Sequence, residues 1–275
     1  MKSNLLLFAR PDRIGCVVCC NGYRILQISQ WENEAETMAE HRKTITVPTN
    51  GPAPAKADSL TQQVYENLKE EILRAERPPG EMVAEPELAA RYGVSKTPIR
   101  EALRLLLQDG WVTALPRKGY LIRPLALEDV REVFSLRQML EPALCAETAR
   151  RRTDADLALL GDLVEQQATS TDQLEGALLA ARLFHTSIAE AAGNGRAIRI
   201  LEGLLDEVRR LHYLMPQLES HITSSEEVDA HRNLVQAFVD RDPERAATLM
   251  HDHLLEAGTA MVEVFGGLGT SRRRA

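Results

Sequence analysis

The sequence has 275 residues, enough for about two domains of ordinary size, and 44% of them are hydrophobic. Aromatic residues make up only 4%, and the alanine- and leucine-rich text after residue 127 has few β-branched runs, so helix is expected to dominate. This composition excludes an all-β sandwich or barrel. The longest apolar stretches fall far short of the roughly 20 residues of a membrane helix, which excludes a bilayer-spanning segment.

The first 55 residues show neither a helical nor a strand period, and they end in a segment rich in proline and glycine. We therefore expect residues 1–55 to form a poorly ordered extension and linker, and Met38 is an alternative translation start. The 4 cysteines are too few and too clustered for a disulfide framework, and no secretory signal is recognised. A cytoplasmic location is the expectation.

The net charge of −7 is unevenly distributed along the chain. Residues 126–275 hold 25 acidic and 16 basic residues, whereas residues 91–123 hold 7 basic and 2 acidic ones. A local excess of positive charge of this kind is typical of a surface that binds phosphates.

The basic region has the pattern of a winged helix-turn-helix, which we place at residues 56–125. Apolar residues recur every four positions after Ser59, a second helix is predicted from about 85 to 92, and Gly93 ends it. Ser95 begins the next helix. Two short strands, 111–115 and 120–122, then flank a basic turn and predict a β-hairpin.

The third predicted helix has the side chains that a recognition helix needs. Short polar or basic residues at its start are suited to base edges, and basic residues one turn later are suited to phosphates or guanine. The hairpin tip is suited to the minor groove, where glycine permits close backbone approach. The predicted DNA-binding residues are Ser95, Lys96, Thr97, Arg100, Arg104, Arg117, Lys118 and Gly119.

These motifs carry a specific resemblance. The run Glu85-x-x-Leu-Ala-x-x-Tyr-Gly-Val-Ser-Lys-Thr-Pro-Ile-Arg-Glu-Ala-Leu103, followed by Gly110-Trp111 and Arg117-Lys-Gly119, resembles the winged helix of GntR-type transcriptional regulators. The resemblance implies that the positions of Lys96, Thr97 and Arg100 and the wing glycine contact DNA. Lys96 stands where the family usually has arginine, so it keeps the charge and loses the two-pronged guanidinium.

The remainder of the chain is predicted to be an antiparallel bundle of six helices, 127–151, 153–168, 171–192, 195–214, 224–240 and 243–264, followed by a disordered tail at 266–275. The fold class is thus mainly α. His185, His231 and His253 lie on the apolar stripes of three of these helices, so their imidazoles can converge on a metal. The alternative to a metal site is that these are structural histidines whose ring nitrogens are hydrogen-bonded within the protein or to solvent. No site is expected at His212 or His221.

The sequence around these histidines resembles the FCD ligand-binding domain of the FadR subfamily. The resemblance is carried by three motifs: Arg137-x-x-Leu-Glu141, Phe184-His185 with the following Gly193-Asn194, and His231-x21-His253. The resemblance implies a divalent metal, zinc or nickel, on the three histidines, and a carboxylate effector held with Arg137 and Asn194. In metal-binding members an aspartate precedes the first histidine by four residues, and Ala181 has that place here.

The resulting hypothesis is a regulator, in the first instance a repressor, that binds palindromic operator DNA as a homodimer and responds to a small organic acid bound in residues 126–265. The sequence leaves two alternatives open. A metal-dependent hydrolase would need a general base beside the metal, such as a His-Glu-x-x-His helix, and none is present. A bundle that has lost its ligand and serves only for dimerisation would be consistent with Ala181.

Overall fold

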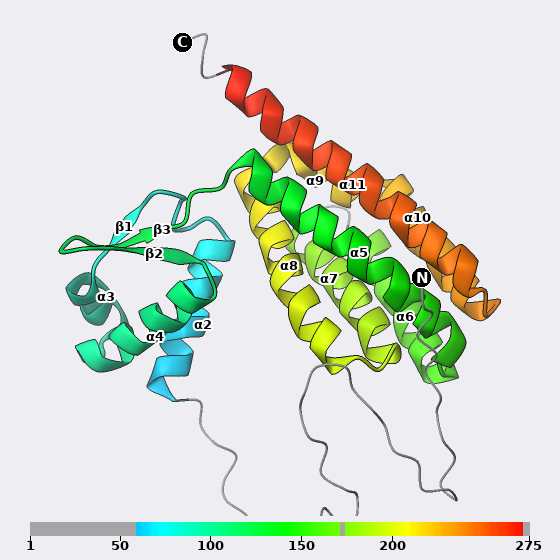
Figure 1. Cartoon of the computed structure of the whole chain (residues 1–275), viewed down its shortest axis with the longest axis horizontal. Helices are drawn as coiled ribbons and strands as arrows, with labels where there is room; N and C mark the ends of the chain where they lie inside the picture. The colour runs from blue at the N-terminus through cyan, green and yellow to red at the C-terminus, as the bar shows by residue number, and fades with distance from the viewer. Residues whose placement is uncertain (1–58, 171–173, 272–275) are drawn as a thin grey trace, which may run out of the picture. The chain divides into compact units, whose positions relative to one another are not determined.

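The computed structural model of the chain describes residues 59–170 and 174–271, with side chains described as far as residue 266. The segment expected to be an extension, residues 1–55 with Met38, lies outside the described residues. The described part is mainly α-helical with one small sheet, as predicted (Figure 1). No described helix combines the length and the apolar character needed to cross a lipid bilayer.

Three helices form the helical part of the winged domain: α2 (Leu60–Leu73), α3 (Glu85–Tyr92) and α4 (Lys96–Gln108). The Ser59 hydroxyl accepts a hydrogen bond from the Gln62 amide and so caps α2. Gly93 ends α3 in the left-handed conformation, at φ 67°, which glycine adopts without a steric penalty. Leu68, Leu88 and Leu103 are fully buried and join the three helices in one core.

The sheet of this domain has three antiparallel strands in the order β1-β3-β2. The hairpin β2 (Val112–Leu115) and β3 (Gly119–Ile122) was predicted, and its register pairs Leu115 with Gly119. The third strand, β1 (Met82–Val83), was not predicted, because two residues are too few to show an alternating pattern. It pairs with the outer edge of β3, so that β3 is the central strand of the sheet.

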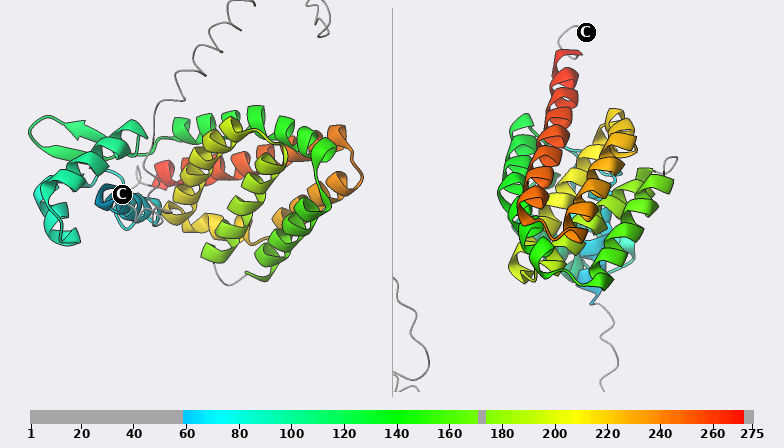
Figure 2. Two further views of the ribbon diagram at one scale, coloured as in Figure 1. Left: turned by 90° about the horizontal axis from the view of Figure 1, so that it is seen from below. Right: turned by 90° about the vertical axis from the view of Figure 1, so that its right-hand side faces the viewer.

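Six long helices form the bundle, and Figures 1 and 2 show α5 and α11 running side by side along it. Four of them agree with the predicted bounds to within one residue, and α7 lies inside its predicted range. The sixth, α11, was predicted to end at 264 and continues to Ser271. The six are α5 (Leu127–Arg151), α6 (Asp154–Thr169), α7 (Leu174–Ala191), α8 (Gly195–Leu214), α10 (Ser225–Val239) and α11 (Pro243–Ser271).

Two short helical turns between α8 and α10 were not predicted: the 3-10 turn η2 (Pro216–Leu218) and α9 (Glu219–Ile222). Helix α8 ends at Leu214, and its C-cap Met215 has φ −129°. Pro216 then starts a new turn because its missing N–H is not needed there. Leu218 and Ile222 are buried. These two side chains therefore pack the turns against the bundle, while Pro216, Gln217, Glu219 and Ser220 remain exposed.

Candidate functional site

The predicted DNA-reading side chains lie at the surface of the winged domain. Ser95, Lys96, Thr97 and Arg100 are all exposed along the first turns of α4. The Arg100 guanidinium donates to Glu85 of α3 through Nε to Oε1 at 3.1 Å and through Nη2 to Oε2 at 2.9 Å. This two-pronged contact directs Arg100 toward α3, and an exposed ion pair of this kind is weak enough to be exchanged for a phosphate or base.

Further basic side chains extend the same surface. Arg104 is exposed on α4 and donates to Glu101, one turn earlier. Arg117 and Lys118 are exposed at the turn of the hairpin, where Arg117 has φ 64°. All the predicted basic residues are therefore accessible for phosphate contacts.

Gly119 is required by the fold itself. It has φ 104°, and a Cβ at this position would lie 2.6 Å from the carbonyl oxygen of Val83 in β1. The sequence interpretation assigned this glycine to close approach of DNA; the structure adds a reason inside the protein, because only glycine lets β1 pack against the wing.

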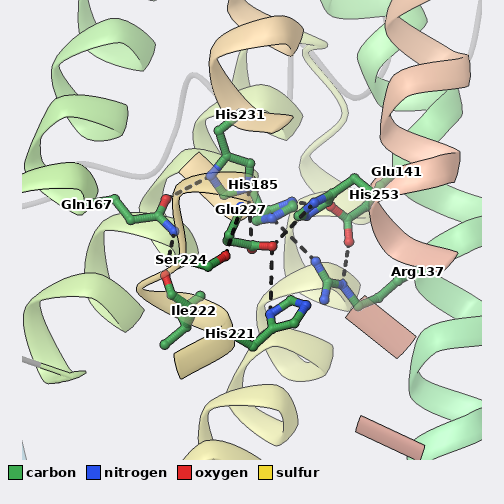
Figure 3. A network of polar contacts seen from close by, with 10 residues as sticks. All are labelled: Arg137, Glu141, Gln167, His185, His221, Ile222, Ser224, Glu227, His231 and His253. Atoms are coloured by element: carbon green, nitrogen blue, oxygen red, sulfur yellow. Dashed lines mark hydrogen bonds and ion pairs between the residues drawn. The ribbon is translucent and has the colours of Figure 1, made fainter. Parts of the chain in front are cut away.

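The three predicted metal-binding histidines come together inside the bundle. His185 of α7, His231 of α10 and His253 of α11 are between 0% and 5% exposed, and each offers a ring nitrogen within 4.8 Å of the other two. Their rings converge from three different helices (Figure 3). Ring centroids are 5.2 Å apart for His185 and His231 and 4.9 Å apart for His231 and His253.

Hydrogen bonds outside the cluster fix which ring nitrogen faces inward. Gln167 of α6 donates its amide N–H to the carbonyl of Ile222 at 3.2 Å, so its carbonyl oxygen faces His231. The Nδ1–H of His231 donates to that oxygen at 2.8 Å, which leaves the lone pair on Nε2. This Nε2 is buried and has no hydrogen-bond partner. A buried acceptor without a partner is costly unless something binds it.

His185 is oriented in the same way by a carboxylate. Its Nδ1–H donates to Glu141 of α5 at 2.5 Å, so Nε2 points to the cluster. Burial lowers the pKa of both His231 and His253 well below the usual histidine range, and the neighbouring imidazoles add to this. Neutral imidazoles whose other nitrogen is held by a carboxylate or amide are the usual form of histidine metal ligands. The donor set therefore fits a divalent cation.

Arg137 lies beside the cluster, as predicted. Its Nε donates to Glu141 at 2.6 Å and its Nη2 is 3.5 Å from His185 Nε2, and both side chains of the pair are nearly fully buried. Burial would raise the pKa of Glu141, but the charge of Arg137 and the contact with His185 outweigh it and hold this pKa at about 2. Glu141 is thus an anion that links the arginine to the first histidine.

A cavity opens next to Arg137 and the histidines. His185 and His253 line it together with Arg182, His212 and Glu227, and apolar side chains such as Leu178, Leu205 and Met261 form the rest of its wall. Arg182, to which the sequence analysis assigned no role, also donates to Asp206 at 3.1 Å. An apolar cavity with a few convergent polar groups is the usual form of a small-molecule site, and the arginines favour an anion.

Two positions singled out in the sequence analysis, 181 and 194, contribute no ligand group to this cavity. Ala181 lines the cavity, and its methyl side chain supplies no carboxylate at the position four residues before His185. Asn194, predicted to hold the effector, is the N-cap of α8: its side chain accepts from the amides of Arg196 and Ala197 at 3.2 Å. Asn194 lines a different surface hollow, so the structure does not bring it together with Arg137.

Several residues of the cluster were missed by sequence reasoning. Glu141 sits one turn after Arg137 on the same helix face, which was a usable signal. Gln167 had no distinguishing pattern. His212 donates its Nδ1–H to the Val208 carbonyl at 3.0 Å, and its buried Nε2 lacks a partner; burial lowers its pKa to about 4. Glu227 is 8% exposed, and burial raises its pKa to about 8.

Comparison with protein families identifies both parts of the chain. Residues 60–122 match the family described as bacterial regulatory proteins, gntR family, and residues 132–256 match the FCD domain. The chain belongs to the GntR family of bacterial transcriptional regulators. The hydrolase alternative is thereby overturned, since both matched domains are regulatory.

Relatives of this GntR regulator agree with the assignment. It is 27% identical to the Nta operon transcriptional regulator of Aminobacter aminovorans over 70% of this chain and 90% of the relative. It is 29% identical to the HTH-type transcriptional repressor GlaR of Escherichia coli, over 70% of this chain and 90% of that repressor. The solved structure of E. coli McbR/YncC has the same fold, with a TM-score of 0.65 and 22% identity over 74% of this chain and 98% of that one.

Proposed function

We propose that this GntR regulator is a homodimeric repressor whose hold on a palindromic operator is controlled by a small carboxylate, bound together with a divalent metal such as zinc or nickel. The observation that carries the proposal is Arg137 in contact with His185, one of three buried, convergent imidazoles, two of which line a cavity together with Arg137. The domains concerned are residues 56–125 for DNA and residues 126–265 for the effector and the dimer contact.

Arg137 is suited to the carboxylate because its planar guanidinium can contact both oxygens. The metal, when bound, would supply a second positive anchor for an effector oxygen. His185, His231 and His253 would hold it, with Glu141 and Gln167 keeping two of the rings in the required tautomer. Metal and effector should therefore strengthen each other's binding by the same factor.

The DNA part of the proposal is tested by operator binding. In a dimer, Arg100→Ala removes one base or phosphate contact per half-site, which costs about 2–6 kcal/mol in total. Arg131→Ala is the matched control, since Arg131 is an exposed arginine on α5, with 55% of its side chain accessible against 63% for Arg100. Operator mobility shifts should show weak binding for the first variant and wild-type binding for the second. Equal binding by both would refute the assignment of α4 as the reading helix.

The effector part is tested by thermal-shift screening of small carboxylic acids, followed by calorimetric titration of a hit with and without zinc. Arg137→Lys keeps the charge and loses the two-pronged contact, so it should weaken the hit, whereas Arg150→Lys on the exposed face of α5 should not. If no carboxylate binds and no metal is retained, the bundle serves for dimerisation only.

A further inference from the structure

The histidine cluster contains one carboxylate that the assignment above leaves unused. Glu227 lies four residues before His231 on α10 and therefore on the same face of that helix. Its Oε1 is 3.9 Å from His231 Nε2, the buried nitrogen without a hydrogen-bond partner, and its Oε2 is 3.7 Å from His253 Nδ1. Figure 3 shows Glu227 extending into the space between the rings.

The other buried carboxylates of the described residues have different partners. Glu141 faces the outer nitrogen of His185 and is paired with Arg137. Asp206 is paired with Arg182 and Lys69. The ion-pair contacts of Glu227, by contrast, are with histidines alone: His221, His231 and His253. A buried carboxylate is stable as an anion only beside a cation, and two of these three histidines, His231 and His253, belong to the proposed metal site.

The distances agree with a shared cation. Histidine nitrogens and carboxylate oxygens lie roughly 2.0–2.2 Å from zinc, so two ligand atoms of one tetrahedral ion are about 3.4 Å apart. The measured 3.7 and 3.9 Å exceed this by at most about half an ångström, which a small rotation of the carboxylate removes. Three imidazoles and one carboxylate form a donor set suited to zinc, nickel or cobalt.

The electrostatic balance points the same way. A divalent ion held by three neutral imidazoles keeps its full charge of +2. Burying that charge in surroundings of low polarity is costly in free energy. Ala181 supplies nothing to offset it. A carboxylate from α10 halves that charge and leaves Arg137 available for an anionic ligand instead of requiring that ligand to complete the metal site.

We propose that Glu227 is the fourth protein ligand of the metal site formed by His185, His231 and His253, supplying from α10 the carboxylate that the alanine at 181 of α7 cannot supply. The inference rests on the proposed metal site but not on the identity of the effector. It predicts that metal binds tightly to the protein alone, and that an effector oxygen would add a fifth ligand, which zinc accepts by expanding its coordination.

The test is zinc titration of the full-length protein after chelator treatment, followed by calorimetry. Glu227→Gln keeps the shape of the side chain and removes its charge, and it should weaken zinc binding by at least the 10- to 100-fold that loss of a supporting residue causes. Glu226→Gln is the matched control, because Glu226 is the exposed neighbour on the same helix; it should bind zinc as the wild type does. The visible spectrum of bound Co²⁺ should differ from the wild type only in Glu227→Gln.

Equal zinc affinity of Glu227→Gln and Glu226→Gln would overturn the inference while leaving a three-histidine site intact. Failure of the wild type itself to bind zinc would overturn the metal site as a whole. Circular dichroism of the chelated proteins establishes that each variant is folded. Should Glu227→Gln not fold, Glu227→Asp withdraws the carboxylate by about one bond and should weaken zinc binding less severely; affinity equal to the wild type would overturn the inference.

Discussion

Replacing Glu141 by glutamine is expected to destabilise the bundle strongly even in the absence of any ligand. Glu141 is 2% exposed and accepts two short hydrogen bonds, from Arg137 at 2.6 Å and from His185 at 2.5 Å. The amide cannot neutralise the arginine, which then remains buried without its counter-charge. The glutamine keeps one acceptor oxygen and loses the other, which removes one charge-assisted bond worth about 1.5–3 kcal/mol. With the arginine left without its counter-charge, the total loss should reach the roughly 3–5 kcal/mol that breaking a buried ion pair costs.

The assay is urea unfolding in the presence of a chelator, so that no bound metal contributes to the free energy of unfolding. Glu147→Gln is the control, since Glu147 forms the same kind of ion pair with Arg150 on the same helix but is exposed, and it should cost less than about 1 kcal/mol. The double replacement Arg137→Met with Glu141→Leu should recover part of the loss, because it leaves no unpaired buried charge. A Glu141→Gln protein as stable as Glu147→Gln would refute this reasoning.

Three further outcomes follow from the structure. Lys118→Ala at the wing should weaken specific and non-specific DNA binding alike. It should also reduce the slope of the logarithm of the binding constant against the logarithm of salt concentration by about one per monomer. An unchanged slope would show that the hairpin does not contact the duplex. Leu68→Ala, at a fully buried position of the winged-domain core, should reduce stability by about 2–5 kcal/mol in denaturant titrations, and a loss below 1 kcal/mol would contradict the packing described. Zinc at 100 times its dissociation constant should stabilise the wild type by about 2.7 kcal/mol, whereas His231→Ala should show little of this effect in thermal melts.

Periodicity and end signals were sufficient to predict most of the helices. The four-residue spacing from Leu60 to Ile72 and the glycine at 93 are local features, and local features determine where a helix begins and ends. The convergence of His185, His231 and His253 was also predictable, because each lies on the apolar stripe of its helix and those stripes must meet in one core. The two-residue strand β1 was not, since its existence depends on pairing with β3.

The residues that surround the histidines were harder to predict because their roles depend on distant partners. Glu227 follows Ser224 by three residues, and Ser224 accepts a hydrogen bond from the Glu227 amide at the start of α10. A serine followed by glutamate at this spacing is typical of a helix start, so the sequence gives this carboxylate a local role. Only the packing of α10 against α11 places it beside His253.

The close approach between Gly119 and β1 has a consequence for how mutational scans of the wing are interpreted. Any side chain at 119 would collide with the Val83 carbonyl oxygen and would also be strained at φ 104°. Gly119→Ala should therefore abolish DNA binding by displacing the hairpin, whether or not the glycine contacts the duplex. In an alanine scan, exposed positions such as Lys118 measure the contribution of individual contacts to the DNA, and position 119 measures the integrity of the scaffold that presents them.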